Sequence, residues 1–195
     1  MTRFYAFLSR MKYIQRWSLM RANVSENIME HSWQTSVIAH ALAVIRNKKF
    51  GGNLDVNRIA TLALFHESSE VITGDLPTPV KYCNKTLTAA YKDLERQAEQ
   101  KLLDMLPEEV REEYTSLIIV DAQSEEYRVV KAADKLAAYI KSIEEVASGN
   151  GEFKKAKESI SKELKKYDMP EVKYFLKECV PAFELTLDEL DLEEL

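Results

Sequence analysis

Cysteine, glycine and proline are scarce in this chain. Its 195 residues include two cysteines, five glycines and five prolines. Cys83 and Cys179 lie far apart without C-x-x-C spacing, so neither a disulfide framework nor a thiolate zinc site is expected. The scarcity of chain breakers, together with abundant Leu, Ala, Glu and Lys, favours helix along the whole chain. The composition therefore predicts an all-α protein.

The sequence also lacks a long uncharged run and a net positive charge. The longest uncharged run, residues 32–45 with His40 counted as neutral, is shorter than the roughly 18 residues that a membrane-spanning helix needs. Residues 1–13 mix charges with apolar residues, so they do not resemble a secretory signal. A formal charge of −5 provides no electrostatic footprint for a nucleic acid polymer, although a local cationic pocket for a small anion remains open. We expect a soluble, cytoplasmic protein with no membrane partner.

Apolar positions recur at helical spacing through most of the sequence. They predict helices over residues 4–14, 33–45, 86–105, 107–119, 124–148, 152–167 and 171–187. A further helix over residues 56–73 begins after a glycine-containing connection in which Asp55 can act as the N-cap. No second-domain linker interrupts the pattern, so we expect one domain over residues 1–195. Trp33 is expected in its core and His40 at the edge of that core.

The loop GDLPTPVKY, residues 74–82, follows the helix 56–73 directly. Its two prolines remove backbone donors and force extended geometry on the residues that precede them. The sequence therefore predicts a stiff loop at the end of this helix.

The segment FHESSE, residues 65–70, puts a histidine beside two glutamates within an apolar helical stretch. His66 and Glu70 are four residues apart and share a helix face, and Glu67 can lean toward the same edge. Neutral imidazole and carboxylate oxygens suit a divalent metal, and a further acid nearby can handle a proton. The alternative interpretation is a solvated helix face that carries charges without chemistry.

A zinc peptidase is a second alternative, because His66 and Glu67 begin like the HExxH motif. The second histidine of that motif is absent here. Glu70 could supply an oxygen ligand instead, but the remaining chemistry would then need His31 or His40 from another helix. Nothing else in the sequence supports peptide hydrolysis.

Three distant segments carry a combined pattern: ENIMEHS at 26–32, FHESSEVITGDLPTPVKY at 65–82 and KAADKLAAY at 131–139. With Arg16-Trp17 before them, the chain resembles the bacterial HD-domain 5′-deoxynucleotidases (YfbR-like), members of the HD superfamily of metal-dependent phosphohydrolases. The order H…HD…D is general to that superfamily, whereas RW, EHS and GDLPTPVKY are more specific. The resemblance implies an HD-domain helical bundle that forms a homodimer. It also implies hydrolysis of deoxyribonucleoside 5′-monophosphates to deoxynucleoside and phosphate.

The resemblance implies a metal site made of His31, His66, Glu67 and Asp134. Glu67 departs from the family pattern, which has Asp after the histidine. Its extra methylene moves the carboxylate outward by roughly 1.5 Å, against metal–oxygen distances of about 2.0–2.2 Å. Two imidazoles and two acids suit a transition metal such as Co²⁺ or Mn²⁺ better than Mg²⁺ or Ca²⁺. There are two alternative hypotheses. One is a nucleotide-binding protein whose catalysis is weakened or lost because Glu67 replaces the signature Asp, and the other is a purely structural helical scaffold.

The resemblance also implies catalytic roles beside the metal. Glu70 would orient or deprotonate the attacking water from outside the ligand set. Arg16 would bind the phosphate with its guanidinium fork and assist catalysis. Trp17 would pack on the sugar or base and crowd the 2′ position against ribonucleotides. Without the resemblance, Arg16-Trp17 is typical of an ordinary helix end.

Further substrate contacts are implied at the metal ligands His31, Glu67 and Asp134 and along the loop after the helix 56–73. The loop residues concerned are Asp75, Leu76, Pro77 and Thr78, with Asp75 accepting a hydrogen bond from the 3′-hydroxyl. A stiff loop loses little entropy when it binds a ligand. Without the resemblance, the same loop is only a helix stop.

Overall fold

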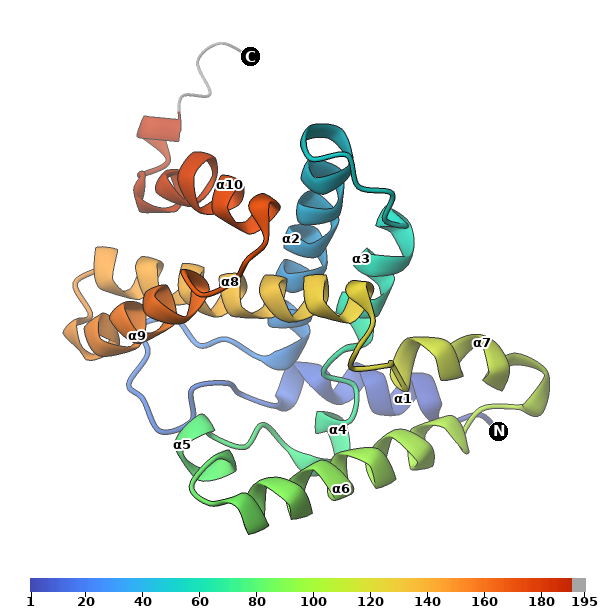
Figure 1. Ribbon diagram of the computed structural model, residues 1–195. Helices are drawn as coiled ribbons and strands as arrows, with labels where there is room; N and C mark the ends of the chain where they lie inside the picture. Colours follow the sequence, from blue (N-terminus) through green and yellow to red (C-terminus); the bar gives the residue numbers. More distant parts are fainter. Residues whose placement is uncertain (191–195) are drawn as a thin grey trace.

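The computed structural model of the protein describes residues 1–190, and within that range helices are joined by turns without any strand (Figure 1). The α-helices are α1 Phe4–Leu8, α2 Ile28–Lys49, α3 Val56–Phe65, α4 Glu70–Thr73, α5 Thr78–Lys81, α6 Lys85–Leu103, α7 Glu108–Ile118, α8 Glu125–Ala147, α9 Lys154–Leu164 and α10 Pro170–Glu178. Short 3-10 helices cover Ser9–Tyr13, Gly151–Phe153, Val180–Glu184 and Asp188–Leu190. The predicted all-α class is confirmed. None of the described helices has the length and apolarity to cross a membrane.

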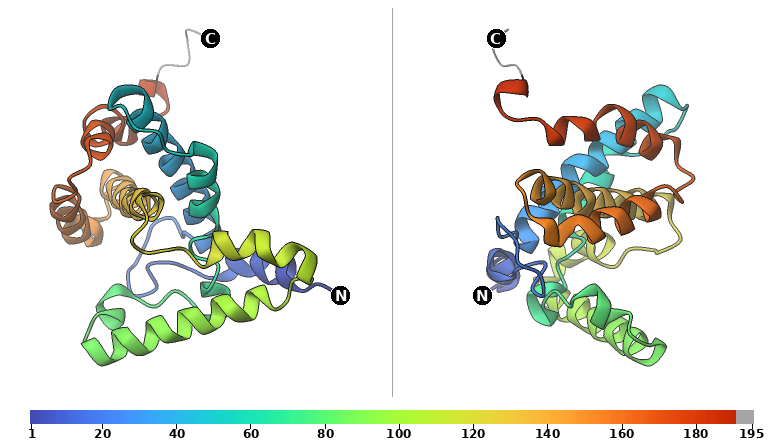
Figure 2. Two further views of the ribbon diagram at one scale, coloured as in Figure 1. Left: turned by 45° about the vertical axis from the view of Figure 1, so that its right-hand side comes forward. Right: turned by 90° about the vertical axis from the view of Figure 1, so that its left-hand side faces the viewer.

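Helix α8 is the central element of the larger core. It packs against α2, α3 and α9, and α10 packs against α2 (Figures 1 and 2). Its apolar side chains recur every three or four residues and so form one buried stripe, made of Val129, Val130, Ala132, Ala133, Leu136, Ala137, Ile140 and Ile143. Each fully buried leucine or isoleucine contributes roughly 1.5–3 kcal/mol of hydrophobic stabilisation. This stripe therefore holds α8 firmly enough to support side chains that project from it.

A smaller core joins α1, α6 and α7 below the main bundle (Figure 2). Phe4 is fully buried there against Leu102 and Leu103, and its ring meets the edge of Tyr114 at 5.0 Å between centroids. Its neighbour Tyr5 is exposed. This cluster packs the N-terminal helix α1 against α6 and α7.

Helix α2 begins earlier than predicted, at Ile28 rather than residue 33. The Asn27 Oδ1 atom accepts hydrogen bonds from the backbone nitrogens of Met29 and Glu30, and the Glu30 carboxylate accepts one from the Asn27 nitrogen, which completes a capping box. Trp33 is 65% exposed and His40 is exposed too, so the prediction of a core tryptophan and a core-edge histidine is wrong. The inward face of α2 is instead the one that carries Ile38 and Leu42.

The helices predicted over residues 86–105, 107–119, 124–148 and 152–167 are confirmed in position as α6, α7, α8 and α9. The helix predicted over residues 4–14 is α-helical only to Leu8 and continues as a 3-10 helix to Tyr13. Asp55 and Ser124 cap α3 and α8 through bonds to the backbone nitrogens three residues on. The predicted helix over residues 171–187 stops at Glu178, and a 3-10 turn that contains Pro181 follows. Proline has no backbone donor, which explains the early end.

A buried ion pair ties the loop before α2 to the far end of α8. Glu145 is 2% exposed, and its carboxylate accepts bonds from the backbone nitrogens of Asn23 and Val24 at 2.8 and 3.1 Å. Lys141 Nζ donates to Glu145 and to the Val24 carbonyl, both at 2.6 Å, and Asn150 donates to Glu145 at 2.8 Å. Because every polar atom of the pair has partners, the burial of these charges is compensated. The loop is therefore held in one position against α8.

We predict that the stability contributed by Glu145 depends on pH. Burial alone would raise the pKa of Glu145, but the bonds from Lys141, Asn23, Asn150 and Val24 outweigh burial and hold the pKa at about 2. A depressed folded-state pKa gives stability that is full above the ordinary glutamate pKa and is lost as pH falls toward 2. Glu145→Gln should lower the free energy of unfolding by about 3 kcal/mol at pH 7. In urea unfolding, the difference in free energy of unfolding between the native protein and Glu145→Gln should become smaller below pH 4. A difference that stays constant to pH 3 contradicts the assignment.

Candidate active site

A break in the predicted helix 56–73 sets the position of His66 and Glu67. Helix α3 ends at Phe65 and α4 starts at Glu70, so the prediction of one continuous helix is wrong. The Phe65 carbonyl accepts two bonds from Ser68, at 3.0 Å from its backbone nitrogen and at 2.6 Å from its hydroxyl. Serine hydroxyls compete with the helical ladder in this way. The break therefore follows from the serine, and His66 and Glu67 project from a turn.

Four side chains of metal-ligand type converge at this turn. His31 comes from the first turn of α2, His66 and Glu67 come from the break after α3, and Asp134 comes from the middle of α8. One ligand atom of each lies within 4.8 Å of those of the others. His31 Nε2 is 3.1 Å from Asp134 Oδ1, and His66 Nε2 is 3.2 Å from Glu67 Oε1. The structure thus brings together the four residues that the sequence singled out, although they are up to 103 positions apart.

Each imidazole ring turns its Nε2 atom toward the cluster, His31 to Asp134 and His66 to Glu67. His66 Nδ1 lies 2.6 Å from the Ala63 carbonyl, so that nitrogen carries a proton and donates it. The buried His66 Nε2 has no hydrogen-bond partner within residues 1–190. Burial, followed by the charge of Arg16, lowers the pKa of His31, which favours a neutral ring. Two imidazole nitrogens and two carboxylate oxygens fit a divalent transition metal, with the Ala63 carbonyl fixing one ring from outside.

The two carboxylates of the cluster are ionised despite their burial. Burial alone would raise the pKa of Asp134, but Lys131 and His31 outweigh it and hold the pKa well below its usual range. The Lys131 ammonium lies 2.6 Å from Asp134 Oδ2. Burial alone would also raise the pKa of Glu67, but the neighbouring His66 outweighs burial and lowers this pKa. Lys131 was not singled out from the sequence, although its position three residues before Asp134 on one helix is a usable signal.

Glu70 lies beside the cluster at the start of α4. It is buried, and its Oε2 atom has no hydrogen-bond partner within residues 1–190. Burial, and then the charge of Glu67, raise the pKa of Glu70. A carboxyl group with a raised pKa next to a metal-type cluster is suited to accept and return a proton.

Arg16 and Trp17 lie on the loop before α2. Burial alone would lower the pKa of Arg16. The surrounding carboxylates outweigh burial and raise this pKa; they belong to Glu67, Glu26, Asp134 and Asp75. The guanidinium is therefore a cation that faces the cluster. The indole of Trp17 packs on the ring of Phe153 at 5.2 Å between centroids. Glu26, which contacts both residues, was not singled out from the sequence.

The loop after α4 starts with an unusual glycine conformation. Gly74 has φ 73° and ψ 163°, a region open essentially to glycine alone. Tyr91 of α6 donates to the Gly74 carbonyl at 2.9 Å and so fixes the beginning of the loop. Burial raises the pKa of Asp75, and the opposing charge of Arg16 is the next largest influence, so Asp75 faces the cluster.

Leu76, Pro77 and Thr78 lie farther along the same loop. Thr78 already starts the helical turn α5, where the sequence predicted loop. Within residues 1–190, no side-chain hydrogen bond joins Leu76, Pro77 or Thr78 to the four-residue cluster. Their role in substrate binding stays a prediction.

We predict that Gly74→Ala destabilises the protein through backbone strain alone. No heavy atom lies within 4 Å of a Cβ added at Gly74, so steric contact contributes nothing. The strained conformation should cost roughly 1–3 kcal/mol in the free energy of unfolding, measured by urea titration. Gly151→Ala is the matched control, because that glycine is equally open but has no positive φ. Equal effects of the two substitutions would rule out the conformational explanation.

The chain matches one protein family and a set of named relatives. The family model described as 5′-deoxynucleotidase YfbR-like matches residues 3–183. The chain is 53% identical to a protein named 5′-deoxynucleotidase from Vibrio vulnificus (strain YJ016), over 96% of this chain and 97% of that protein. It is 50% identical, over the full length of both chains, to a protein of the same name from Yersinia pestis (strain Pestoides F).

Solved structures support the helical fold. An HD-domain phosphohydrolase from Listeria innocua is similar with a TM-score of 0.81 and 24% identity, over 93% of this chain and 88% of that one. A cyanophage S-2L HD phosphohydrolase, solved with dA and one catalytic Zn²⁺, gives a TM-score of 0.60 and 18% identity, over 90% and 95% of the two chains. At these identities the likeness concerns the fold, and it confirms the predicted HD-type helical bundle.

Proposed function

The chain belongs to the YfbR-like 5′-deoxynucleotidase family, and we propose that it hydrolyses deoxyribonucleoside 5′-monophosphates to a deoxynucleoside and phosphate. The observation that carries this proposal is the convergence of two imidazoles and two carboxylates beside the buried acid Glu70. Names of relatives at about half identity over the full length support the same activity. These names do not support the alternative hypothesis that Glu67 has caused the protein to lose catalysis.

We propose His31, His66, Glu67 and Asp134 as the ligands of a divalent metal. Glu67 is included despite its extra methylene relative to Asp. What supports its inclusion is that its Oε1 atom, in the turn after α3, lies 3.2 Å from His66 Nε2. A divalent metal bound there would supply Lewis acidity toward a phosphoryl oxygen and lower the pKa of nearby water. Its identity, with Co²⁺ and Mn²⁺ as candidates, stays a prediction.

The protein's own groups would perform the proton and charge transfers. Arg16 binds the phosphate and offsets the charge that grows on its oxygens. Glu70 accepts a proton from the attacking water as its oxygen bonds to phosphorus. When the bond from phosphorus to the 5′-oxygen breaks, Glu70 returns that proton to the leaving oxygen. The raised pKa of Glu70 suits the second transfer.

The deoxyribose would lie between the two loops. Trp17 packs on the sugar or base and crowds the 2′ position, while Asp75 accepts a hydrogen bond from the 3′-hydroxyl. Leu76, Pro77 and Thr78 line the same side of the substrate, and the metal ligands His31, Glu67 and Asp134 lie within reach of its phosphate. The two prolines at positions 77 and 79 keep the loop stiff and so limit the entropy lost on binding.

Three further expectations belong to this proposal. They are a single domain over residues 1–195, a homodimer and a cytoplasmic location. Sedimentation equilibrium of the purified chain measures the oligomeric state directly.

We predict that the purified chain releases phosphate from deoxynucleoside monophosphates faster than from the matching ribonucleotides in the presence of Co²⁺ or Mn²⁺. Replacing Glu70 with Gln should lower kcat about 10²- to 10⁴-fold with little change in KM, because the proton acceptor is lost while substrate contacts remain. A phosphate-release assay measures both. Absence of turnover with every metal refutes the proposed activity, and an unchanged kcat removes Glu70 from the mechanism.

We also predict that metal binding depends on Asp134. Elemental analysis after dialysis against Mn²⁺ or Co²⁺ should find an equimolar ion in the native protein. Asp134→Asn should weaken metal affinity at least about 10-fold, since even partners outside the ligand set commonly contribute that much. Asp93→Asn, at an exposed aspartate on α6, is the control and should retain the ion. Equal metal content in both variants would show that the ion binds elsewhere.

A further inference from the structure

Glu26 is a nearly buried carboxylate, 9% exposed, on the segment just before α2. It is not a member of the proposed ligand set. Its Oε2 atom accepts two hydrogen bonds, from Arg16 Nε at 3.1 Å and from Trp17 Nε1 at 2.8 Å. The two side chains proposed to contact opposite ends of the substrate therefore converge on a single oxygen.

The other oxygen of Glu26 lies on the side of His31 that is turned away from Asp134. Oε1 lies 4.0 Å from His31 Nδ1, a buried atom without a hydrogen-bond partner within residues 1–190. The backbone is fixed as well, because the Arg16 nitrogen donates to the Glu26 carbonyl at 2.8 Å and Gln15 forms an isolated antiparallel bridge with Asn27. Glu26 thus connects the arginine, the tryptophan and one metal-site histidine through a rigid frame.

We propose that Glu26 is a positioning residue that sets the orientations of Arg16 and Trp17 together and thereby couples phosphate binding to selection of deoxyribose. This inference rests on the function proposed above. Glu26 does not touch the reacting atoms. It acts through the two side chains that it holds.

The arginine geometry gives the first argument. A guanidinium has five N–H donors in a planar fork. Glu26 engages the Nε donor, and Arg16 makes no other side-chain hydrogen bond within residues 1–190. The two terminal nitrogens are left for a phosphate. Since the fork is planar, fixing Nε limits the directions in which they can point.

The backbone of Trp17 gives the second argument. Its φ is 58°, in the left-handed region that residues with a Cβ rarely adopt. Such a conformation persists only where surrounding contacts determine it. The indole bonds to Glu26 and packs against the ring of Phe153, which is tilted by 59° to it. Loss of Glu26 therefore releases a strained residue, and the indole is free to leave the position that would crowd a 2′-hydroxyl.

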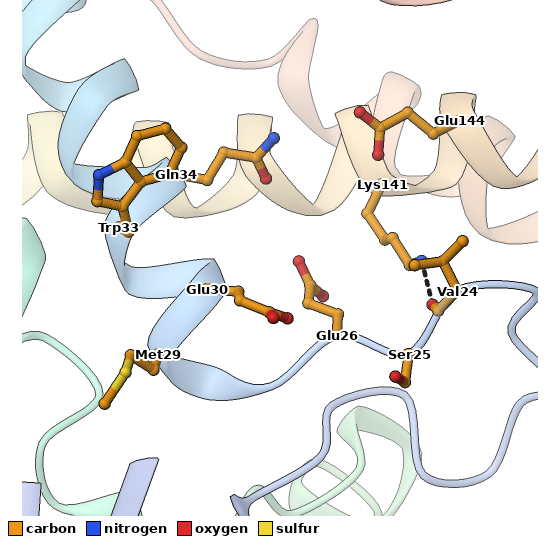
Figure 3. Close-up of a pocket in the computed structure, with 9 residues that line it drawn as sticks. All are labelled: Val24, Ser25, Glu26, Met29, Glu30, Trp33, Gln34, Lys141 and Glu144. Atoms are coloured by element: carbon orange, nitrogen blue, oxygen red, sulfur yellow. Dashed lines mark hydrogen bonds between the residues drawn. The ribbon is translucent and has the colours of Figure 1, made fainter. Parts of the chain in front are cut away.

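A neighbouring acid offers a matched control. Glu26 and Glu144 both line an open cavity of about 540 Å³ that also contains Glu30, Lys141 and Trp33 (Figure 3). Glu144 projects from α8 on the far side of that cavity and makes no side-chain hydrogen bond or ion pair within residues 1–190. Glu144→Gln thus removes the same charge from the same cavity without touching Arg16 or Trp17.

The first experiment measures kcat and KM of the metal-loaded protein for dAMP and AMP. Glu26→Ala should lower kcat/KM for dAMP at least 10-fold and narrow the ratio of dAMP to AMP activity. Glu26→Gln should fall between Glu26→Ala and the native protein, because one amide oxygen can still accept both bonds. Glu144→Gln should stay within twofold of the native values. An unchanged dAMP-to-AMP ratio in an active Glu26→Ala protein overturns the proposal, since a purely structural role lowers both activities equally.

The second experiment needs neither turnover nor metal. The chain has two tryptophans, so Trp33→Phe leaves Trp17 as the single tryptophan, whose emission is excited selectively over that of the tyrosines. In that background, Glu26→Ala should increase acrylamide quenching of Trp17, Glu26→Gln should restore much of the protection, and Glu144→Gln should have no effect. Unchanged quenching in Glu26→Ala overturns the proposal. If the native protein hydrolyses no deoxynucleotide, the proposed function fails on its own, and quenching still decides whether Glu26 holds Trp17.

Discussion

The crowding of two ionised, largely but not fully buried carboxylates at one point is the constraint around which this protein is built. Glu67 and Asp134 repel each other, and a protein interior solvates neither of them well. Lys131 and Arg16 supply positive charge, and an imidazole nitrogen lies beside each carboxylate. The site is therefore suited to a cation. The rest of the structure prevents these groups from moving apart to relieve the repulsion.

Each part of the site is held by an ordinary element of helical structure. A capping box fixes the first turn of α2 and with it His31. A serine that bonds back to its own helix produces the turn that presents His66 and Glu67. The apolar stripe of α8 sets the rotation of Asp134. Precision at the site thus comes from backbone hydrogen bonds and packing.

Much of this arrangement could be predicted from the sequence. Helical spacing and caps give most helix positions, and the combined motifs identify the four residues that meet. The break after α3 could not be predicted from spacing, because the apolar pattern continues through it and the decisive interaction is a single hydroxyl bond. The exposure of Trp33 was missed for a related reason. Helix α2 carries apolar residues on several faces, so the pattern alone does not tell which face is turned inward. Glu26 lies in an irregular segment, where no periodicity marks a residue as buried.

The anchoring of the loop before α2 by Glu145 and Lys141 affects how such a protein can diverge. The segment that bears Arg16 and Trp17 shares its hydrogen bonds with the central helix, so the wall of the site belongs to the same cooperative unit as the core. A mutation that loosened this wall to admit bulkier ligands would also weaken the fold. Broader specificity is therefore linked to lower thermodynamic stability. Evolutionary change in this wall of the site is limited by folding as well as by catalysis.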